Sequence, residues 1–107
     1  MPHCFIQHDQ QTILTLSGSL DSEEALTLKS VIDQFIETES KDLTVDMAQI
    51  SFLDSSGIGL LVYAFKRLRS ENRQMALRDV QGQPEDLMKM LRIDKAISME
   101  STKGEAA

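Results

Sequence analysis

Two consecutive serines after an aspartate are the residues of this sequence best placed to do chemistry. Asp54, Ser55, Ser56 and Gly57 come directly before an apolar, helix-like run. A serine at such a point commonly caps the helix, because its hydroxyl oxygen accepts a hydrogen bond from a backbone N–H group that would otherwise lack a partner. A single residue occupies the cap position. If Ser56 is the cap, Ser55 lies at the mouth of the helix, in front of the positive end of the helix dipole.

A serine hydroxyl in that place can carry a phosphate group that the helix itself tolerates. The phosphate would add about −1.5 to −2 units of charge to a surface that we expect to include Asp21, Asp46 and Asp54. The fold would survive this change, whereas a docked protein would be repelled. The residues alone leave two roles open for the pair: plain capping, and a phosphorylation switch with Ser55 as the acceptor and Ser56 as the alternative.

Other kinds of active site find no support in the sequence. A nucleophilic serine needs a base, but no histidine is suitably placed beside Asp54 and Ser55, and the G-x-S-x-G elbow is absent. The phosphate-binding G-x-x-x-x-G-K-[ST] loop is absent too. His3 and His8 lack a neighbouring cluster of carboxylates or thiolates, so we predict no metal site and no cofactor. An enzyme is therefore the least supported hypothesis.

Two further sets of residues have structural roles in this interpretation. Asp46 is expected to lie at a strand end and to orient the following loop by accepting backbone hydrogen bonds, rather than to bind a metal. Met75, Met88 and Met90 are expected to fill gaps in the core, because the flexible thioether side chain adapts to irregular spaces.

The composition is that of one globular domain. The chain has 107 residues, of which 41% are hydrophobic and 26% charged, which is enough to build one core. We assign residues 1–100 to a single domain and expect residues 101–107 to form a flexible tail. The 11 basic and 17 acidic residues give a net charge of −6. This balance argues against nucleic-acid binding, because contacts to phosphates need clustered Lys and Arg.

Three features of the sequence predict a cytoplasmic location. Cys4 is the single cysteine, so no internal disulfide can form, which is typical of a reducing compartment. The longest apolar stretch, residues 58–65, is far shorter than the roughly 20 residues that cross a bilayer. The first residues lack the cationic and apolar segments of a secretory signal. We therefore expect no membrane insertion.

Strands and helices alternate along most of the chain. Alternating and short apolar runs predict strands over residues 4–8, 12–17, 43–47, 50–53, 75–80 and 96–99. Helices are predicted from Asp21, which forms a D-x-x-E capping box, from the turn at Asp54 to about residue 70, and over residues 84–92. The first two strands form a hairpin, and the later strands need crossovers, which favour a mostly parallel sheet. The predicted class is α/β, with Asp46 and Asp54 at the carboxyl ends of strands.

The helix that follows Asp54 has two apolar faces. Its core-facing stripe is Ile58, Leu61, Val62, Phe65 and Leu68. A second face carries Leu60, Tyr63, Ala64 and Arg67. Another element of the domain could cover this second face, or it could be an exposed surface for a partner, and we favour the partner because Tyr and Arg are enriched in interfaces. Gly59 costs the helix up to ~1 kcal/mol, which indicates a close approach to its backbone.

The sequence resembles a known family in two blocks. These are Asp46 to Gly59, reading D-M-A-Q-I-S-F-L-D-S-S-G-I-G, and Gly18 to Asp21, reading G-S-L-D. Both are similar to blocks of the bacterial STAS-domain anti-sigma-factor antagonists. The resemblance implies a small, mostly parallel sheet with an N-terminal antiparallel strand, flanked by helices. It also implies that Ser55 is the phosphoacceptor and that Asp54 and Asp21 shape the surface around it.

The resemblance further implies a binding function. In this family the unphosphorylated form binds an anti-sigma factor or a serine kinase of the histidine-kinase-like ATPase type. Phosphorylation ends the interaction, and a PPM-type phosphatase restores it. The surface expected to bind the partner consists of Asp21, Asp54, Ser55, Ser56, Gly57, Leu60, Tyr63 and Arg67. The alternative is a constitutive STAS subunit of a transporter or of a larger signalling assembly.

The sequence departs from the family pattern in two places. Asn72 and Arg73 stand where many relatives carry glycine before a strand, and Asn is expected to adopt the same left-handed conformation. Arg92 and Ile93 replace a common Gly-Leu pair. The sequence therefore does not determine at which residue the third helix ends.

Overall fold

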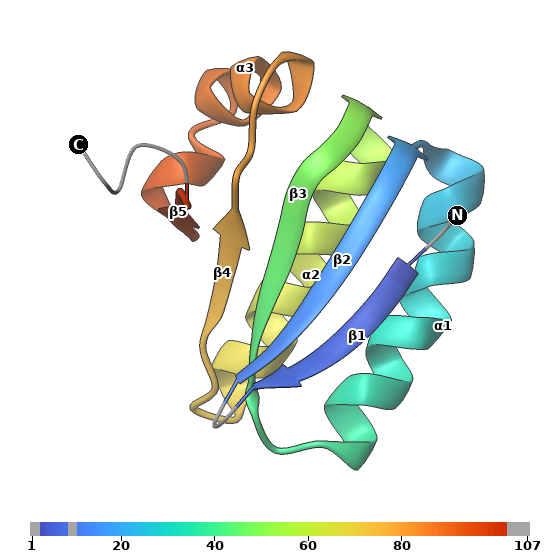
Figure 1. Cartoon of the computed structure of the whole chain (residues 1–107), viewed down its shortest axis with the longest axis vertical. Helices are drawn as coiled ribbons and strands as arrows, with labels where there is room; N and C mark the ends of the chain where they lie inside the picture. The colour runs from blue at the N-terminus through green and yellow to red at the C-terminus, as the bar shows by residue number, and fades with distance from the viewer. Residues whose placement is uncertain (1–2, 9–10, 103–107) are drawn as a thin grey trace.

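The computed structural model describes residues 3–8 and 11–102. Within these residues five strands form one sheet in the order β1-β2-β3-β4-β5 (Figure 1). The elements are β1 (His3–His8), β2 (Gln11–Leu20), α1 (Ser22–Thr38), β3 (Asp42–Leu53), α2 (Ser55–Ser70), β4 (Met75–Arg78), α3 (Gln83–Met90), the 3-10 helix η1 (Ile93–Lys95) and β5 (Ser98–Glu100). β1 pairs antiparallel with β2, and the later pairs are parallel. The predicted α/β class with an N-terminal antiparallel strand is confirmed.

The core lies between the sheet and the helices α1 and α2, which cover one of its faces (Figure 1). Leu14, Val45 and Leu77 form one row across β2, β3 and β4 and are completely buried. The helices contribute Ala25, Leu28, Ile32, Phe35, Ile36, Ile58, Leu60, Leu61, Ala64 and Leu68 to the same core. Burial of each large aliphatic side chain stabilises the fold by about 1.5–3 kcal/mol, so this packing holds the two helices against the sheet.

β3 is one long strand rather than the two short strands predicted from the sequence. Its pairing with β2 shifts twice, between Thr15 and Ser17 and between Gly18 and Ser19. At each shift β3 contains one residue more than β2, which is the pattern of a β-bulge. Each extra residue changes which side chains face the core, so buried residues fall at Met47, Ile50 and Leu53 instead of at every second position. Because the alternation of apolar and polar residues is interrupted at these bulges, the sequence pattern predicts two strands where the structure has one.

The C-terminus of α2 depends on a left-handed residue that is not glycine. Asn72 has a φ of 61°. Its N–H group donates to the carbonyl of Arg69 (3.0 Å), and the N–H of Arg73 donates to that of Leu68 (2.9 Å), so two terminal carbonyl groups are satisfied. The expectation that Asn72 takes the place of a glycine is confirmed.

The region after β4 differs in its boundaries from the predicted elements. β4 ends at Arg78, and α3 ends at Met90 because Arg92 has a φ of 60° and breaks the helix. β5 covers Ser98–Glu100 instead of residues 96–99. The N–H of Thr102 donates to Oδ1 of Asp79 (2.8 Å). The rest of the predicted tail, residues 103–107, lies outside the described residues, as does the hairpin turn at residues 9–10.

Candidate functional site

Asp54 caps α2. Its backbone is extended (φ −114°, ψ −173°), and its Oδ1 accepts hydrogen bonds from the N–H groups of Ser56 (2.9 Å) and Gly57 (3.1 Å). Its carbonyl accepts the N–H of Ile58 (3.0 Å). The hypothesis that Ser56 is the cap is therefore wrong. A carboxylate satisfies two N–H groups at once and places its negative charge at the positive end of the helix dipole, which a hydroxyl does not do.

The two serines differ in their surroundings. Ser55 is the first residue of α2 and is exposed, as expected for a phosphoacceptor at the mouth of the helix. Ser56 is half-buried and lines a groove between α1 and α2. Since a kinase must reach the hydroxyl, the geometry favours Ser55 over Ser56.

Gly57 fixes how closely α2 approaches the sheet. A Cβ atom there would lie 2.5 Å from Cδ1 of Leu53 and 2.7 Å from the carbonyl oxygen of Leu20. Only a glycine fits between the helix and the ends of β2 and β3. At Gly59, by contrast, a Cβ atom would meet nothing within 4 Å. The expected close approach therefore occurs at Gly57, and the prediction that a part of the chain lies against Gly59 is wrong.

The N-termini of α1 and α2 lie together at one edge of the sheet. Leu20 and Leu53 are paired at the ends of β2 and β3, and each is followed by an aspartate that caps a helix. Asp21 accepts the N–H of Glu24 through Oδ1 (3.0 Å), so its predicted role as a cap is confirmed. The site thus presents two carboxylates and the exposed Ser55 at the same edge.

Asp46 does not belong to this edge. It lies well before the end of β3, where its Oδ2 pairs with Nη2 of Arg78 (2.9 Å) and its Oδ1 accepts the N–H of Ala48 (3.0 Å). The backbone hydrogen bond was predicted, but it serves the first β-bulge rather than a loop, because the strand continues. The expected acidic surface is therefore made by Asp21 and Asp54.

A groove of about 300 Å³ runs between the N-terminal halves of α1 and α2. It is lined by Ser22, Ala25, Leu26, Lys29, Ser56, Gly59, Leu60 and Tyr63. Leu26 is 74% exposed at its rim. The missing side chain of Gly59 leaves the groove open, and Ser56 connects it to the turn that carries Ser55. The groove is therefore an open, largely apolar hollow beside the turn that carries Ser55.

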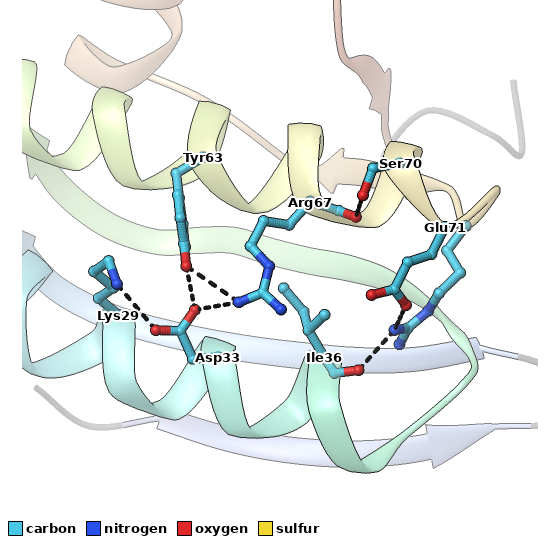
Figure 2. Close-up of polar contacts among 8 residues, drawn as sticks. Lys29, Asp33, Ile36, Tyr63, Arg67, Ser70 and Glu71 are labelled. Carbon is cyan, nitrogen blue, oxygen red and sulfur yellow. Dashed lines mark hydrogen bonds and ion pairs between the residues drawn. The ribbon is translucent and has the colours of Figure 1, made fainter.

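The second face of α2 is covered by α1, so the expectation of an exposed patch there is wrong. Leu60 is 5% exposed and Ala64 is completely buried. Tyr63 and Arg67 point toward α1 and bind Asp33 (Figure 2). Val62 and Phe65, assigned to the core stripe, are half-buried. The periodicity shows that a face is apolar but not which element covers it.

Asp33 joins α1 to α2. Its Oδ1 accepts hydrogen bonds from the hydroxyl of Tyr63 and from Nη1 of Arg67 (2.8 Å), and its Oδ2 accepts one from Nζ of Lys29 (3.0 Å) (Figure 2). The Tyr63 hydrogen bond, followed by that of Lys29, holds the pKa of Asp33 below its usual value. The Asp33 carboxylate raises the pKa of Lys29. The hydrogen bond to Tyr63 is the main cause of a raised pKa at Arg67. These contacts set the separation of the helices where the groove ends.

Several residues of the site were not predicted. Leu26 lies outside the apolar stripe of α1 that faces the core. A leucine off this stripe was the feature of the sequence that could have identified it. Lys29 and Asp33 are spaced as an i, i+4 ion pair, but nothing in the local pattern connects Asp33 to a residue thirty positions later.

Among the described residues, no three His, Cys, Asp or Glu side chains gather as a metal site would require. Met75 and Met88 are buried as expected, but Met90 is 76% exposed and does not fill the core. None of the helices in the described part of the chain is long and apolar enough to span a membrane.

Comparisons with known proteins agree with this geometry. The model of the STAS domain family matches residues 5–106. An anti-sigma-B factor antagonist of Listeria monocytogenes is 26% identical over 90 residues, which cover 84% of this chain and 79% of that protein.

Solved structures show the same fold. An anti-sigma factor antagonist from Mycobacterium paratuberculosis has a TM-score of 0.84 at 21% identity, covering 98% of this chain and 89% of that one. The Bacillus cell fate determinant SpoIIAA in its phosphorylated form has a TM-score of 0.75 at 19% identity, covering 98% and 96%. Because the family model spans nearly the whole chain, the chain belongs to the STAS domain family, and its resemblance to the anti-sigma-factor antagonists of that family is confirmed.

Proposed function

We propose that this chain is a phosphorylation-controlled binding protein that acts as an anti-sigma-factor antagonist, with Ser55 as its phosphoacceptor. The observation that carries the proposal is the division of roles in the turn. Asp54 caps α2, so the helix does not need the hydroxyl of the exposed Ser55 as its cap. The similarity to SpoIIAA, a protein with a phosphorylated form, supports the same function.

The electrostatics of the turn explain how a phosphate would change binding while the fold persists. The N–H groups of Ser56 and Gly57 already bond to Asp54, so a phosphate on Ser55 does not have to replace any hydrogen bond of the cap. The added dianion lies at the positive end of α2, which tolerates it. It also lies beside the carboxylates of Asp54 and Asp21. The result is a strongly negative surface on an unchanged scaffold.

The binding surface consists of the turn and the adjoining groove. Asp21, Asp54, Ser55 and Ser56 form the polar part of the proposed surface, and the buried Gly57 supports it from below by letting α2 start close to the sheet. Leu60 and Tyr63 contribute where they line the groove. Arg67 acts from behind it, because it holds Asp33 and Tyr63 in place.

The proposed partner is an anti-sigma factor or a serine kinase of the histidine-kinase-like ATPase type, bound while Ser55 is unphosphorylated. A PPM-type phosphatase would restore the binding form. The chain itself performs no reaction, takes no cofactor and binds no nucleic acid. Its place is the bacterial cytoplasm, where transcription is regulated.

Phosphate mapping tests the acceptor residue. The chain is incubated with ATP and a serine kinase of the proposed histidine-kinase-like ATPase type, and mass spectrometry locates the modification. We expect one phosphate on Ser55, which is lost in Ser55→Ala and kept in the matched variant Ser56→Ala. Phosphate at another residue, or equal modification of Ser55→Ala, would sink the assignment.

A charge substitution tests the switch. Ser55→Asp is expected to weaken kinase binding by about tenfold or more, since like charges placed across an interface are strongly unfavourable. Its circular dichroism spectrum should stay native. Ser30→Asp adds the same charge at an exposed position of α1 outside the groove and should bind normally. A stable complex that Ser55→Asp does not affect would instead support a constitutive subunit.

A further inference from the structure

β4 accompanies β3 over only part of its length. Among the described residues, β4 pairs with β3 from Leu43 to Asp46, whereas β3 continues beside β2 as far as Leu53. The edge of β3 that faces β4 therefore extends beyond its strand partner. Two glutamine side chains bond to β3 in this region: Gln81, from the segment that joins β4 to α3, and Gln83, the first residue of α3.

Gln83 replaces the missing strand at the last residue of β3. The N–H of Leu53 donates to Oε1 of Gln83 (2.8 Å), and Nε2 of Gln83 donates to the carbonyl of Leu53 (2.8 Å). One carboxamide thus satisfies both backbone groups of Leu53, as a neighbouring strand would do. Farther back, Nε2 of Gln81 donates to the carbonyl of Ala48 (2.8 Å).

Leu53 is the residue on which the turn with Ser55 rests. Its side chain is completely buried, and its Cδ1 atom lies directly against Gly57. On the β2 side, the neighbouring N–H of Asp54 reaches the carbonyl of Leu20 at the long distance of 3.5 Å. The two bonds from Gln83 are shorter than this contact. Because Asp54 follows directly and caps α2, a shift of Leu53 would move the cap and Ser55 together.

We propose that Gln83 is a positioning residue for phosphoryl transfer, which holds the backbone of Leu53 and thereby places the Ser55 hydroxyl. In the transfer, the Ser55 oxygen forms a bond to the γ-phosphorus of ATP, and the bond from that phosphorus to the β–γ bridging oxygen breaks. The serine proton passes to a base of the kinase, and ADP leaves. Gln83 touches none of these atoms. Its effect on the rate rests on the proposed function, whereas its hold on the turn does not.

Hydrogen exchange tests the hold on the turn in the unphosphorylated chain. Gln83→Met keeps the length of the side chain and removes both hydrogen bonds. Amide exchange at Leu53 should become at least about tenfold faster, and exchange at Ser56 and Gly57 should also rise. Gln81→Met is the matched control and should leave these amides within about twofold of the wild type. Unchanged exchange at Leu53, or an equal rise in both variants, would overturn the proposal.

A second variant covers the case in which Gln83→Met does not fold. Gln83→Asn keeps the carboxamide but is one methylene shorter, so it cannot make both bonds to Leu53. We expect the same faster exchange at Leu53 with a native circular dichroism spectrum. Full protection in this variant would contradict the proposed geometry.

The role of Gln83 in phosphoryl transfer is tested by kinetics with a serine kinase that phosphorylates the wild-type chain. Gln83→Met should lower kcat about tenfold and leave KM within about twofold, because it misplaces the nucleophile without changing the docking surface. Gln81→Met should match the wild type. A rise in KM at constant kcat would show a docking role and refute positioning. If the wild-type chain receives no phosphate on Ser55, the transfer role fails with the proposed function, while hydrogen exchange still decides whether Gln83 holds the turn.

Discussion

The two ends of the α1–α2 pair are built in opposite ways. Both helices start at the same edge of the sheet, after Leu20 and Leu53. At this end a groove of about 300 Å³ separates them beside Ser55. Toward the other end, polar contacts of Asp33 join α1 to α2 (Figure 2). Arg73 joins α1 to the chain beyond α2. The hydrogen bonds and ion pairs at this end hold the two helices together. The groove at the N-terminal end can therefore stay open while the helices remain packed.

Arg73 completes the closed end. Its Nη1 donates to the carbonyl of Ile36 (2.9 Å), and its Nε and Nη2 both donate to the carbonyl of Lys41 (3.0 and 2.8 Å). α1 has no basic residue in its last turn. Arg73 therefore supplies, from beyond α2, the positive charge and the donors that the C-terminus of α1 requires.

Removing the side chain of Arg73 from the closed end should have the largest effect on the stability of the fold. Arg73→Met leaves buried carbonyl groups without donors, and we expect the free energy of unfolding to fall by about 3 kcal/mol. Urea denaturation followed by circular dichroism measures it. Arg69→Met, at an exposed arginine of the same region, should cost less than about 1 kcal/mol. Equal losses in the two variants would show that Arg73 has no special role at the closed end.

A methyl group at Gly57 should have the next largest effect. In Gly57→Ala the new carbon would press on Leu53 and on the backbone of Leu20, and such overpacking costs about 2 kcal/mol. The start of α2 must then move away from the sheet, so exchange of the Ser56 amide should rise as well. Stability equal to the wild type would mean that the open end is less rigid than its packing implies.

Neutralising Asp33 should have a smaller effect that depends on pH. Asp33→Asn is expected to cost about 1 kcal/mol near neutral pH, since the site is partly exposed. The folded-state pKa of Asp33 is lowered, chiefly by Tyr63, so between that value and the ordinary pKa of 3.8 the unfolded chain binds more protons. The stabilisation is therefore complete above about pH 4 to 5 and is lost as the pH falls further.

Urea titrations between pH 3 and pH 8 measure this dependence. The difference in the free energy of unfolding between the wild type and Asp33→Asn should be constant in the upper half of this pH range and should shrink at acid pH. Glu37→Gln, at an exposed position of α1, should show no such difference. A difference that grows as the pH falls would have the wrong sign and would contradict the assignment.

The smallest effect on stability is expected at Gly59. In Gly59→Ala the methyl group meets nothing within 4 Å, and the better helix former should stabilise the chain by up to about 1 kcal/mol. The same methyl group enters the groove and should weaken kinase binding severalfold. Urea denaturation measures the effect on stability, and calorimetry measures the effect on kinase binding. Unchanged binding would exclude the groove from the proposed surface.

Much of the fold could be predicted, because it depends on residues close in sequence. The stripe from Ala25 to Ile36 repeats at helical spacing, and Asp21 lies three residues before Glu24, so α1 and its cap follow from residues that are close together in the sequence. The role of Asn72 follows from its backbone preference. The continuity of β3 could not be predicted, because its two bulges shift the alternation and become visible only in the pairing with β2.

Within the site, the sequence determined that an aspartate and two serines open an amphipathic helix. It did not determine which of them caps the helix, because a carboxylate and a hydroxyl compete for the same N–H groups and the backbone conformation of Asp54 decides. The tertiary structure alone decided that α1 covers Leu60 and Ala64, that Gly57 rather than Gly59 is in close contact, and that Gln83 bonds to Leu53. The physical reason is range: capping and periodicity act within a few residues. By contrast, α1 and α2, Gly57 and Leu20, and Gln83 and Leu53 are about thirty or more residues apart, and only the crossovers of the sheet bring them together.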